Sequence, residues 1–250
     1  MLLKVTDLKK SFATEEGRLD VLRGVDLELA AGERLALTGE SGCGKSTLLY
    51  LVGALEEFDG GDIRIENQSL AGLSDRERAA LRRDSIGIIF QQFNLIPSLT
   101  VANNLSFHAR LAGREDAVWN EQLAQRLGLT EFLRAYPEQL SGGQQQRVAI
   151  GRTLAARPKL ILADEPTGNL DEKTSEDVLN LMLELVAETG AGLLMVTHSP
   201  RMADRMDRHR HAPFLRFGDG MVPLDLAPQR STAQPARRRG LSDRRATSGW

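Results

Sequence analysis

The sequence predicts an α/β fold of the phosphate-loop type, built around a parallel sheet. Residues 39–46, GESGCGKS, fit the pattern G-x-x-x-x-G-K-[ST] directly after the strand-like run 35–38. Continuous apolar runs recur at 160–163 and 193–196, and a helical stretch at 176–188 separates them. Strand, helix and strand with uninterrupted apolar runs are typical of a parallel sheet that is covered on both faces.

The N-terminal part is predicted to form a second, antiparallel sheet. Residues 3–5 and 21–29 alternate between apolar and polar side chains, up to a turn at 31–32. Residues 60–66 repeat this pattern after a turn. We therefore expect an antiparallel sheet beside the strand that leads into the phosphate loop.

The middle of the chain is predicted to be mainly helical. Residues 75–83 are charged and helical, and 86–90 read as a buried strand. Residues 101–155 are mostly helical, with Pro97 and Pro137 as breaks. No internal repeat is apparent.

Composition is that of a globular chain with one or two domains. Its 250 residues are 41% apolar, and no apolar run approaches the roughly 18 to 20 residues of a spanning helix. The first ten residues lack the apolar core of a signal peptide, so we expect a cytoplasmic protein. Cys43 is the only cysteine, which excludes an internal disulfide. We interpret Cys43 as a small residue that fits the tight phosphate loop.

The net charge of −2 conceals an arginine-rich C-terminal segment. Residues 227–250 are rich in Pro, Ser, Thr, Ala and Arg and lack apolar periodicity, so a disordered tail is predicted. For its arginines a solvated extension is the default, and attraction to anionic lipid or nucleic acid is the alternative. For the protein as a whole no nucleic-acid partner is expected.

The phosphate loop predicts a nucleotide site with Mg²⁺. Its glycines let backbone N–H groups point at a polyphosphate, next to the positive end of a helix. Lys45 is expected to reach the β- and γ-phosphates, and the Ser46 hydroxyl to ligate Mg²⁺. The predicted nucleotide contacts of this segment are Gly39, Ser41, Gly42, Cys43, Gly44, Lys45, Ser46 and Thr47.

Two strand ends carry further candidate residues. Asp164 and Glu165 follow the run 160–163, at the sheet edge where open α/β folds bind ligands. Asp164 is a candidate for the Mg²⁺ shell, and Glu165 for the base that deprotonates an attacking water. His198 follows 193–196, where an imidazole can donate to a γ-phosphate oxygen. The alternatives are a solvated strand end and a surface histidine.

Residues 140–144, LSGGQ, precede a helix-forming run, with Ser141 at the N-cap position. A serine hydroxyl and free amides at a helix N-terminus form an anion-binding surface. The phosphate that it would bind is left open, and a plain N-cap with flexible glycines is the alternative.

The order of these motifs resembles the nucleotide-binding subunits of ABC transporters. LSGGQ lies between the phosphate loop and LILADE at 160–165, and the resemblance covers about residues 2–222. It implies a phosphate-loop NTPase fold of ABC type, a parallel-sheet core with an antiparallel β-subdomain and a helical subdomain at about 92–157. The implied ATP-binding domain is 1–226, followed by the tail at 227–250.

The resemblance also implies a head-to-tail homodimer with two shared ATP sites. Each site would combine one subunit's phosphate loop with the signature of the other, that is Ser141, Gly142, Gly143 and Gln144. Gln91 matches the family's Q-loop glutamine, a catalytic and Mg²⁺-binding position, and His198 its switch histidine. Asp171 matches the D-loop, and Phe12 the aromatic that stacks on adenine.

Three segments resemble a narrower group, the LolD/MacB/YbbA-like subunits for lipoprotein release or macrolide and peptide export. They are 90–97, FQQFNLIP; 163–171, ADEPTGNLD; and an extended loop at 13–20. The group implies an ATPase on the inner face of the membrane that powers a separate integral-membrane permease. An FtsE-like regulatory ATPase that drives cell-wall remodelling is the alternative. A chromosome or DNA-repair ATPase is excluded, because the 49 positions between Gln91 and Ser141 leave no room for a coiled coil.

Overall fold

The parallel sheet has five strands in the order β6-β7-β8-β3-β9, and every neighbouring pair is parallel. The computed structural model describes residues 1–15 and 17–211 of the chain. Within them the sheet comprises β3 (Arg34–Thr38), β6 (Ile86–Ile89), β7 (Leu160–Asp164), β8 (Gly192–Val196) and β9 (Arg208–His211). The predicted strands at 35–38, 86–90, 160–163 and 193–196 are therefore confirmed, and β9 is an edge strand that the sequence did not predict.

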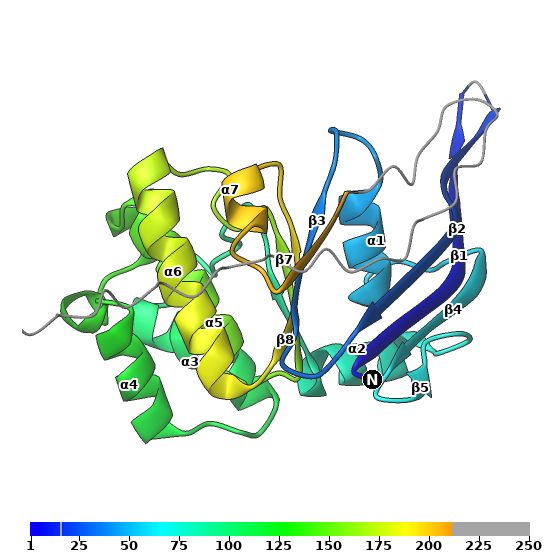
Figure 1. Ribbon diagram of the computed structural model, residues 1–250. Helices are drawn as coiled ribbons and strands as arrows, with labels where there is room; N and C mark the ends of the chain where they lie inside the picture. Colours follow the sequence, from blue (N-terminus) through cyan, green and yellow to red (C-terminus); the bar gives the residue numbers. More distant parts are fainter. Residues whose placement is uncertain (16, 212–250) are drawn as a thin grey trace, which may run out of the picture. The chain divides into compact units, whose positions relative to one another are not determined.

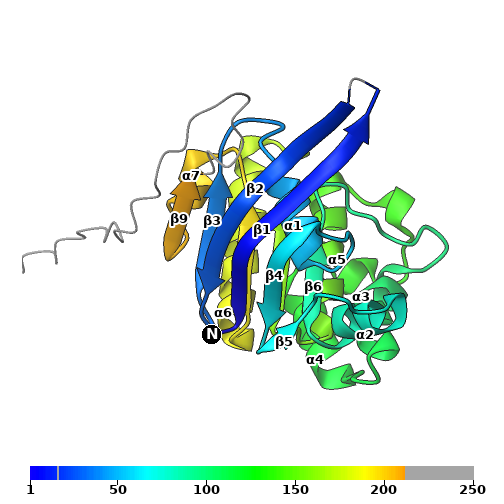
Figure 2. The ribbon, with the colours of Figure 1, turned by 90° about the vertical axis from the view of Figure 1, so that its right-hand side faces the viewer.

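The antiparallel sheet has the order β2-β1-β4-β5. Its strands are β1 (Leu3–Thr14), β2 (Gly17–Leu29), β4 (Gly60–Ile65) and β5 (Gln68–Ser69). Figure 2 shows β1 and β2 as a long hairpin. The extended loop expected at 13–20 is wrong for most of its length, because the strands run on to Thr14 and resume at Gly17. Both faces of this end of the hairpin are exposed, which removes the apolar alternation that would have revealed it.

The helices connect the strands and cover the parallel sheet. They are α1 (Lys45–Val52), α2 (Asp75–Asp84), α3 (Val101–Leu111), α4 (Ala117–Arg126), α5 (Gly142–Ala155), α6 (Glu172–Thr189) and α7 (Pro200–Ala203), with 3-10 turns at Thr130–Phe132 and Pro137–Gln139. α6 begins four residues before the predicted 176, because the Asp171 carboxylate accepts a hydrogen bond from the Thr174 amide at 3.0 Å and caps the helix.

Two apolar cores lie on opposite faces of the parallel sheet. Ile161 and Ala163 of β7 pack on the side of α3, α5 and α6, whereas Leu160 and Leu162 pack on the side of α1 and the antiparallel sheet. Figure 1 shows this layering, with α3, α5 and α6 on one side of the sheet and α1 with the hairpin sheet on the other. All five residues of β7 and of β8 are buried, which explains their uninterrupted apolar sequences.

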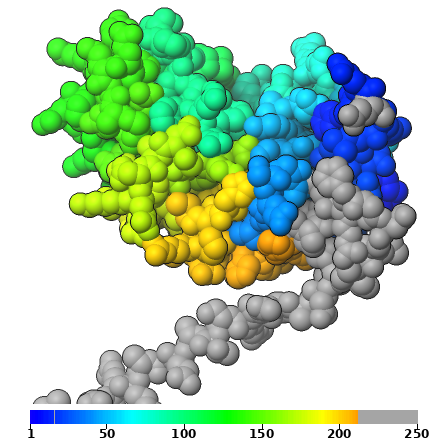
Figure 3. Space-filling view, turned by 90° about the horizontal axis from the view of Figure 1, so that it is seen from above, coloured from blue at the N-terminus to red at the C-terminus, as the bar shows by residue number. Residues whose placement is uncertain are grey.

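The carboxyl ends of the parallel strands meet at one edge of the sheet. The segments that follow β3, β6, β7 and β8 are the phosphate loop, the segment at Gln91, the Asp164–Glu165 pair and the segment at His198. Figure 3 looks onto this edge, where the blue segment around residue 40 lies beside the yellow segment near residue 195. The topology therefore brings together four of the predicted site segments.

Two predictions lie outside the described residues. These are the domain boundary at 226 and the disordered tail at 227–250. In residues 1–15 and 17–211, no helix is long and apolar enough to span a membrane.

Candidate nucleotide-binding site

The phosphate loop joins β3 to α1 in the conformation that its glycines permit. Gly42 and Gly44 have backbone φ angles of 77° and 83°, which residues with a Cβ rarely adopt. Gly44 is the N-cap of α1, and among the described residues no side chain caps this helix. Its first amides therefore remain available to an anion, and the helix dipole favours one there.

Lys45 is buried, with 5% of its surface exposed. Its ammonium donates hydrogen bonds to the backbone carbonyls of Gly39 and Glu40, at 2.9 and 2.7 Å. The Lys45 ammonium also lies 3.5 Å from Cys43 Sγ. The charge is thus held inside the loop, on flexible carbonyl partners that phosphate oxygens can replace. Thr47 follows in the first turn of α1.

Asp164 lies at the end of β7 and is 7% exposed. Its Oδ1 accepts a hydrogen bond from Ser46 Oγ at 2.9 Å, so the two predicted Mg²⁺ ligands are in contact. Its Oδ2 accepts a hydrogen bond from the Tyr50 hydroxyl, also at 2.9 Å. Burial, followed by the bond to Asp164, raises the pKa of Tyr50 to about 12. The sequence analysis missed Tyr50, although its spacing of four from Ser46 places both on one helix face.

Glu165 and His198 are adjacent, with Glu165 Oε1 and His198 Nε2 2.6 Å apart. Glu165 has φ of 44°, in the left-handed region, and its amide donates to Val196 O at 2.9 Å. This turn directs the carboxylate away from the strand axis and toward the end of β8. Two of the three predicted catalytic residues are therefore brought together at the carboxyl edge of the sheet.

Gln91 is held by a reciprocal pair of hydrogen bonds to Asn169. Gln91 Nε2 donates to Asn169 Oδ1 at 3.3 Å, and Asn169 Nδ2 donates to Gln91 O at 3.0 Å. A Cβ built at Gly168 would lie 3.0 Å from Gln91 Nε2 and 3.3 Å from Glu165 Oε2. Gln91 thus lies near the predicted base. Asn169 is a second residue that the sequence analysis did not single out for a role.

The signature residues form a separate cluster at the start of α5. Ser141 and Gln144 form a capping box, in which the Ser141 amide donates to Gln144 Oε1 at 2.8 Å and the Gln144 amide to Ser141 Oγ at 3.3 Å. A Cβ built at Gly143 would lie 2.6 Å from Thr174 Cγ2, which places the signature against the start of α6. Within residues 1–15 and 17–211, no hydrogen bond joins Ser141–Gln144 to the phosphate loop.

The cluster at the start of α5 also includes Gly142 of the signature and the D-loop residue Asp171. Hydrogen bonds from the Thr174 side chain and amide lower the pKa of Asp171, which keeps this carboxylate ionised as the α6 cap. A Cβ built at Gly142 would lie 3.4 Å from Leu170 Cδ2. The structure thus places the predicted D-loop aspartate beside the signature, at a helix N-terminus.

Phe12 lies on β1 in the exposed part of the hairpin, opposite Leu19 on β2. Its ring is 37% exposed, and the Lys10 ammonium lies 4.8 Å from the ring centre. The exposed ring is accessible to a planar ligand. Its contact with adenine stays a prediction.

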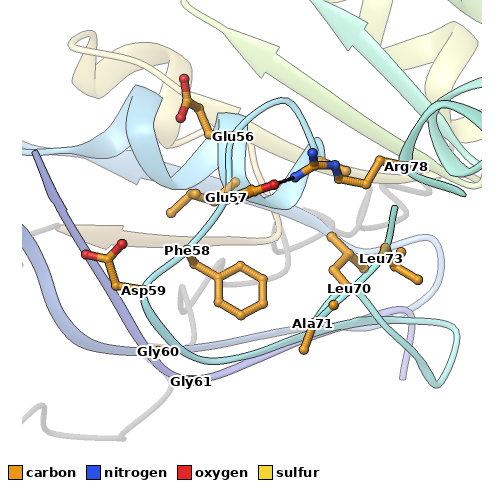
Figure 4. Close-up of a pocket in the computed structure, with 13 residues that line it drawn as sticks. Glu56, Glu57, Phe58, Asp59, Gly60, Gly61, Leu70, Ala71, Leu73 and Arg78 are labelled. Atoms are coloured by element: carbon orange, nitrogen blue, oxygen red, sulfur yellow. Dashed lines mark ion pairs between the residues drawn. The ribbon is translucent and has the colours of Figure 1, made fainter. Parts of the chain in front are cut away.

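A pocket of about 520 Å³ lies away from these residues, between the end of α1, β4 and the segment before α2. Figure 4 shows Phe58 in its interior and Glu57 paired with Arg78, at 2.7 Å. Asp59, also in its lining, pairs with Arg18 at 3.0 Å. Because these carboxylates already have cationic partners, we assign the pocket no ligand.

Comparison with known proteins decides the family. The model of the family described as "ABC transporter" matches residues 22–168. The chain belongs to the ABC transporter family. The lipoprotein-releasing system ATP-binding protein LolD of Maricaulis maris is 44% identical over 222 residues, which cover 88% of this chain and 95% of LolD. An uncharacterized ABC transporter ATP-binding protein of Mycobacterium tuberculosis H37Rv is also 44% identical, over 83% of this chain and 85% of the relative.

Solved ABC cassettes have the same fold. The dimeric structure of the bacterial ABC transporter cassette MJ0796 is 38% identical, with a TM-score of 0.77 over 84% of this chain and 94% of the cassette. Its post-hydrolysis state bound to ADP and Pi is similar, with a TM-score of 0.78 at 37% identity. These comparisons confirm the predicted family, the ABC-type fold and the ATPase class of function.

Proposed function

We propose that this ABC ATPase hydrolyses Mg²⁺-bound ATP at the carboxyl edge of its parallel sheet to power a separate membrane permease. The observation that carries the proposal is the meeting of a phosphate loop, the Ser46–Asp164 contact and the Glu165–His198 contact at one edge. Phosphoryl transfer requires anion binding, metal ligation and orientation of the attacking water. The phosphate loop, the Ser46–Asp164 pair and the Glu165–His198 pair supply these three functions in that order.

Glu165 is the proposed base. Its carboxylate accepts the proton of the attacking water. His198, whose Nε2 lies 2.6 Å from Glu165 Oε1, orients this carboxylate. The imidazole also donates to the phosphate that is transferred. General-base catalysis contributes roughly 10² to 10⁴ in rate. Gln91 orients the same water from its position near Glu165, where Asn169 holds its amide.

Ser46 and Asp164 fit a magnesium ion by the chemistry of their donors. A hydroxyl and a carboxylate oxygen 2.9 Å apart supply the hard oxygen ligands that Mg²⁺ takes, with phosphates and waters completing the shell. Gln91 would add an amide oxygen. When bound, Mg²⁺ neutralises charge that develops on the β- and γ-phosphates.

The signature supports a shared site in a homodimer. Ser141 and Gly143 lie in a cluster with the start of α6. Among the described residues, no hydrogen bond joins this cluster to the phosphate loop of the same chain. We propose that these residues grip the γ-phosphate held by a second copy. The related cassette MJ0796 has a dimeric structure, which supports the dimer that this proposal requires.

The permease is proposed to dock in an apolar groove of about 310 Å³ between β6, α2, α3 and α5. Phe90, the neighbour of Gln91, lines the groove together with Leu111, which is 60% exposed, and with the cationic Arg82 and Arg83. Arg83 already pairs with Asp84 at 2.8 Å, so the apolar part of the lining is the part that an apolar helix complements. The subunit would then lie on the cytoplasmic face of the membrane. The relatives named LolD favour lipoprotein release as the cargo class, and no observation favours the FtsE-like alternative.

Mixing two inactive chains tests the shared site. Lys45→Ala removes the loop's cation, and Ser141→Arg fills the signature surface. One composite site per heterodimer then remains intact, so ATP hydrolysis by the mixture should exceed that of either variant alone. Heterodimers that form, as shown by two affinity tags, but hydrolyse no ATP above both backgrounds would contradict the proposal.

A further inference from the structure

Both oxygens of the Asp164 carboxylate are held from one face of α1. Ser46 Oγ donates to Oδ1 and the Tyr50 hydroxyl donates to Oδ2, each at 2.9 Å. Asp164 is 7% exposed, so few waters compete for these lone pairs. A carboxylate with a donor on each oxygen cannot rotate about its terminal bond without breaking one hydrogen bond.

The Tyr50 hydroxyl is placed by packing on two sides. The residue follows Ser46 by one helical turn, and its ring lies at 6.4 Å from that of Phe90, tilted by 49°. The ring also packs against the core that α1 forms with the antiparallel sheet. A ring fixed in this way delivers its hydroxyl to one position at little cost in side-chain entropy.

We propose that Tyr50 is a positioning residue for the magnesium site, acting through Asp164. The inference rests on the proposed Mg²⁺ site of Ser46 and Asp164. With Oδ2 occupied by the hydroxyl, Oδ1 stays turned toward Ser46, so the two ligand oxygens are arranged before metal and nucleotide arrive. Groups that orient metal ligands in this manner typically change metal affinity about 10- to 100-fold when they are removed.

Tyr50→Phe deletes the hydroxyl and keeps the ring against Phe90. The full chain carrying Glu165→Gln, which prevents consumption of ATP, is titrated with ATP in EDTA and then at increasing Mg²⁺. With EDTA, Tyr50→Phe and its parent should bind ATP equally within about twofold, since the loop is unchanged. The Mg²⁺ concentration for half of the maximal gain in ATP affinity should rise about tenfold in the variant.

Tyr136→Phe is the matched control, because it removes the chain's other phenol from an exposed position, 44% exposed, on the turn before the signature. It should leave the Mg²⁺ dependence unchanged. An unchanged Mg²⁺ dependence in Tyr50→Phe, with or without a lower melting temperature, overturns the role and leaves the hydroxyl a structural group. Tighter Mg²⁺ binding also overturns it, because the hydroxyl would then be a competitor for Asp164. A parent whose ATP affinity is independent of Mg²⁺ overturns the metal site itself.

Discussion

An alanine at position 168 tests whether Gln91 must remain beside the proposed base. The added Cβ would lie 3.0 Å from Gln91 Nε2 and 3.3 Å from Glu165 Oε2, closer than ordinary contact. Gly168 is not among the glycines with positive φ, so alanine can keep the backbone as it is. Because Gln91 is an exposed side chain, the methyl group should displace it rather than unfold its surroundings.

The size of the effect follows from the bond that the displacement breaks. Gln91 Nε2 donates to Asn169 Oδ1 at 3.3 Å, whereas the second bond joins Asn169 Nδ2 to the Gln91 backbone oxygen at 3.0 Å and does not involve the displaced side chain. A neutral hydrogen bond of this kind contributes about 1 kcal/mol. If the transition state requires Gln91 in this position, the loss lowers kcat by roughly fivefold. A shift of the Glu165 carboxylate away from the attacking water would increase it to about 100-fold.

The assay is steady-state ATP hydrolysis by the full chain, together with its melting temperature. Asn169→Ala removes the bond from Gln91 Nε2, together with the bond to the Gln91 backbone oxygen, without adding an atom, and should lower kcat by about fivefold or more. Gly60→Ala is the control, since its Cβ would meet only Lys9 carbons at 3.7 and 3.8 Å. If Gly168→Ala retains kcat within twofold of Gly60→Ala, Gln91 does not need this position, and the reasoning is refuted.

Three further substitutions address the proposed base, the loop cation and a partly buried histidine. Glu165→Gln should keep ATP binding but lower turnover by roughly 10²- to 10⁴-fold, which corresponds to a barrier about 3 to 5 kcal/mol higher. The variant should accumulate as an ATP-bound dimer on size exclusion. Turnover within threefold of the parent would rule out Glu165 as base. Lys45→Ala should weaken ATP binding about 10- to 100-fold in calorimetry, because a charged donor is lost, and an unchanged affinity would contradict the assigned loop function. Burial and the charge of Arg152 lower the pKa of His108 to about 4 in the folded chain. As the pH falls, the unfolded chain therefore binds a proton at this histidine before the folded chain does. The free energy of unfolding should fall by roughly 3 kcal/mol between pH 6.5 and pH 4 as a result. Urea denaturation at both pH values should show a smaller fall for His108→Gln, and equal falls would argue against this assignment.

The sequence predicts the sheet core well because burial on both faces leaves a distinct pattern. β7 and β8 have no exposed residue, so their apolar runs end where the chain leaves the core. The polar residues that follow each run, Asp164 with Glu165 after one and Thr197 with His198 after the other, therefore had to lie at the carboxyl edge. Fold class and both residues of the proposed catalytic pair follow from this one pattern.

Features without such a pattern were missed. β9 is an edge strand of alternating arginine and histidine, and its pairing with β3 depends on partners far away in sequence, such as the Arg34–Asp207 ion pair at 2.6 Å. Tyr50 and Asn169 look like ordinary helix and loop residues, and only the tertiary structure sets them against Asp164 and Gln91. Whether Phe12 stacks on adenine is a property of the complex, which the free ring's exposure does not determine.

The segment 165–174 connects the parts of the site that come from different regions of the chain. At its start Glu165 contacts His198, in the middle Asn169 binds Gln91, and at its end the Thr174 methyl occupies the space that Gly143 leaves by lacking a Cβ. Close-packed contacts of this kind transmit displacement, because neither side can move without opening a void or a clash. A displacement of the signature would therefore be expected to displace the start of α6, and with it the residues that hold Gln91. Packing thus connects the signature to the proposed base of its own subunit, although no hydrogen bond among the described residues joins it to the phosphate loop.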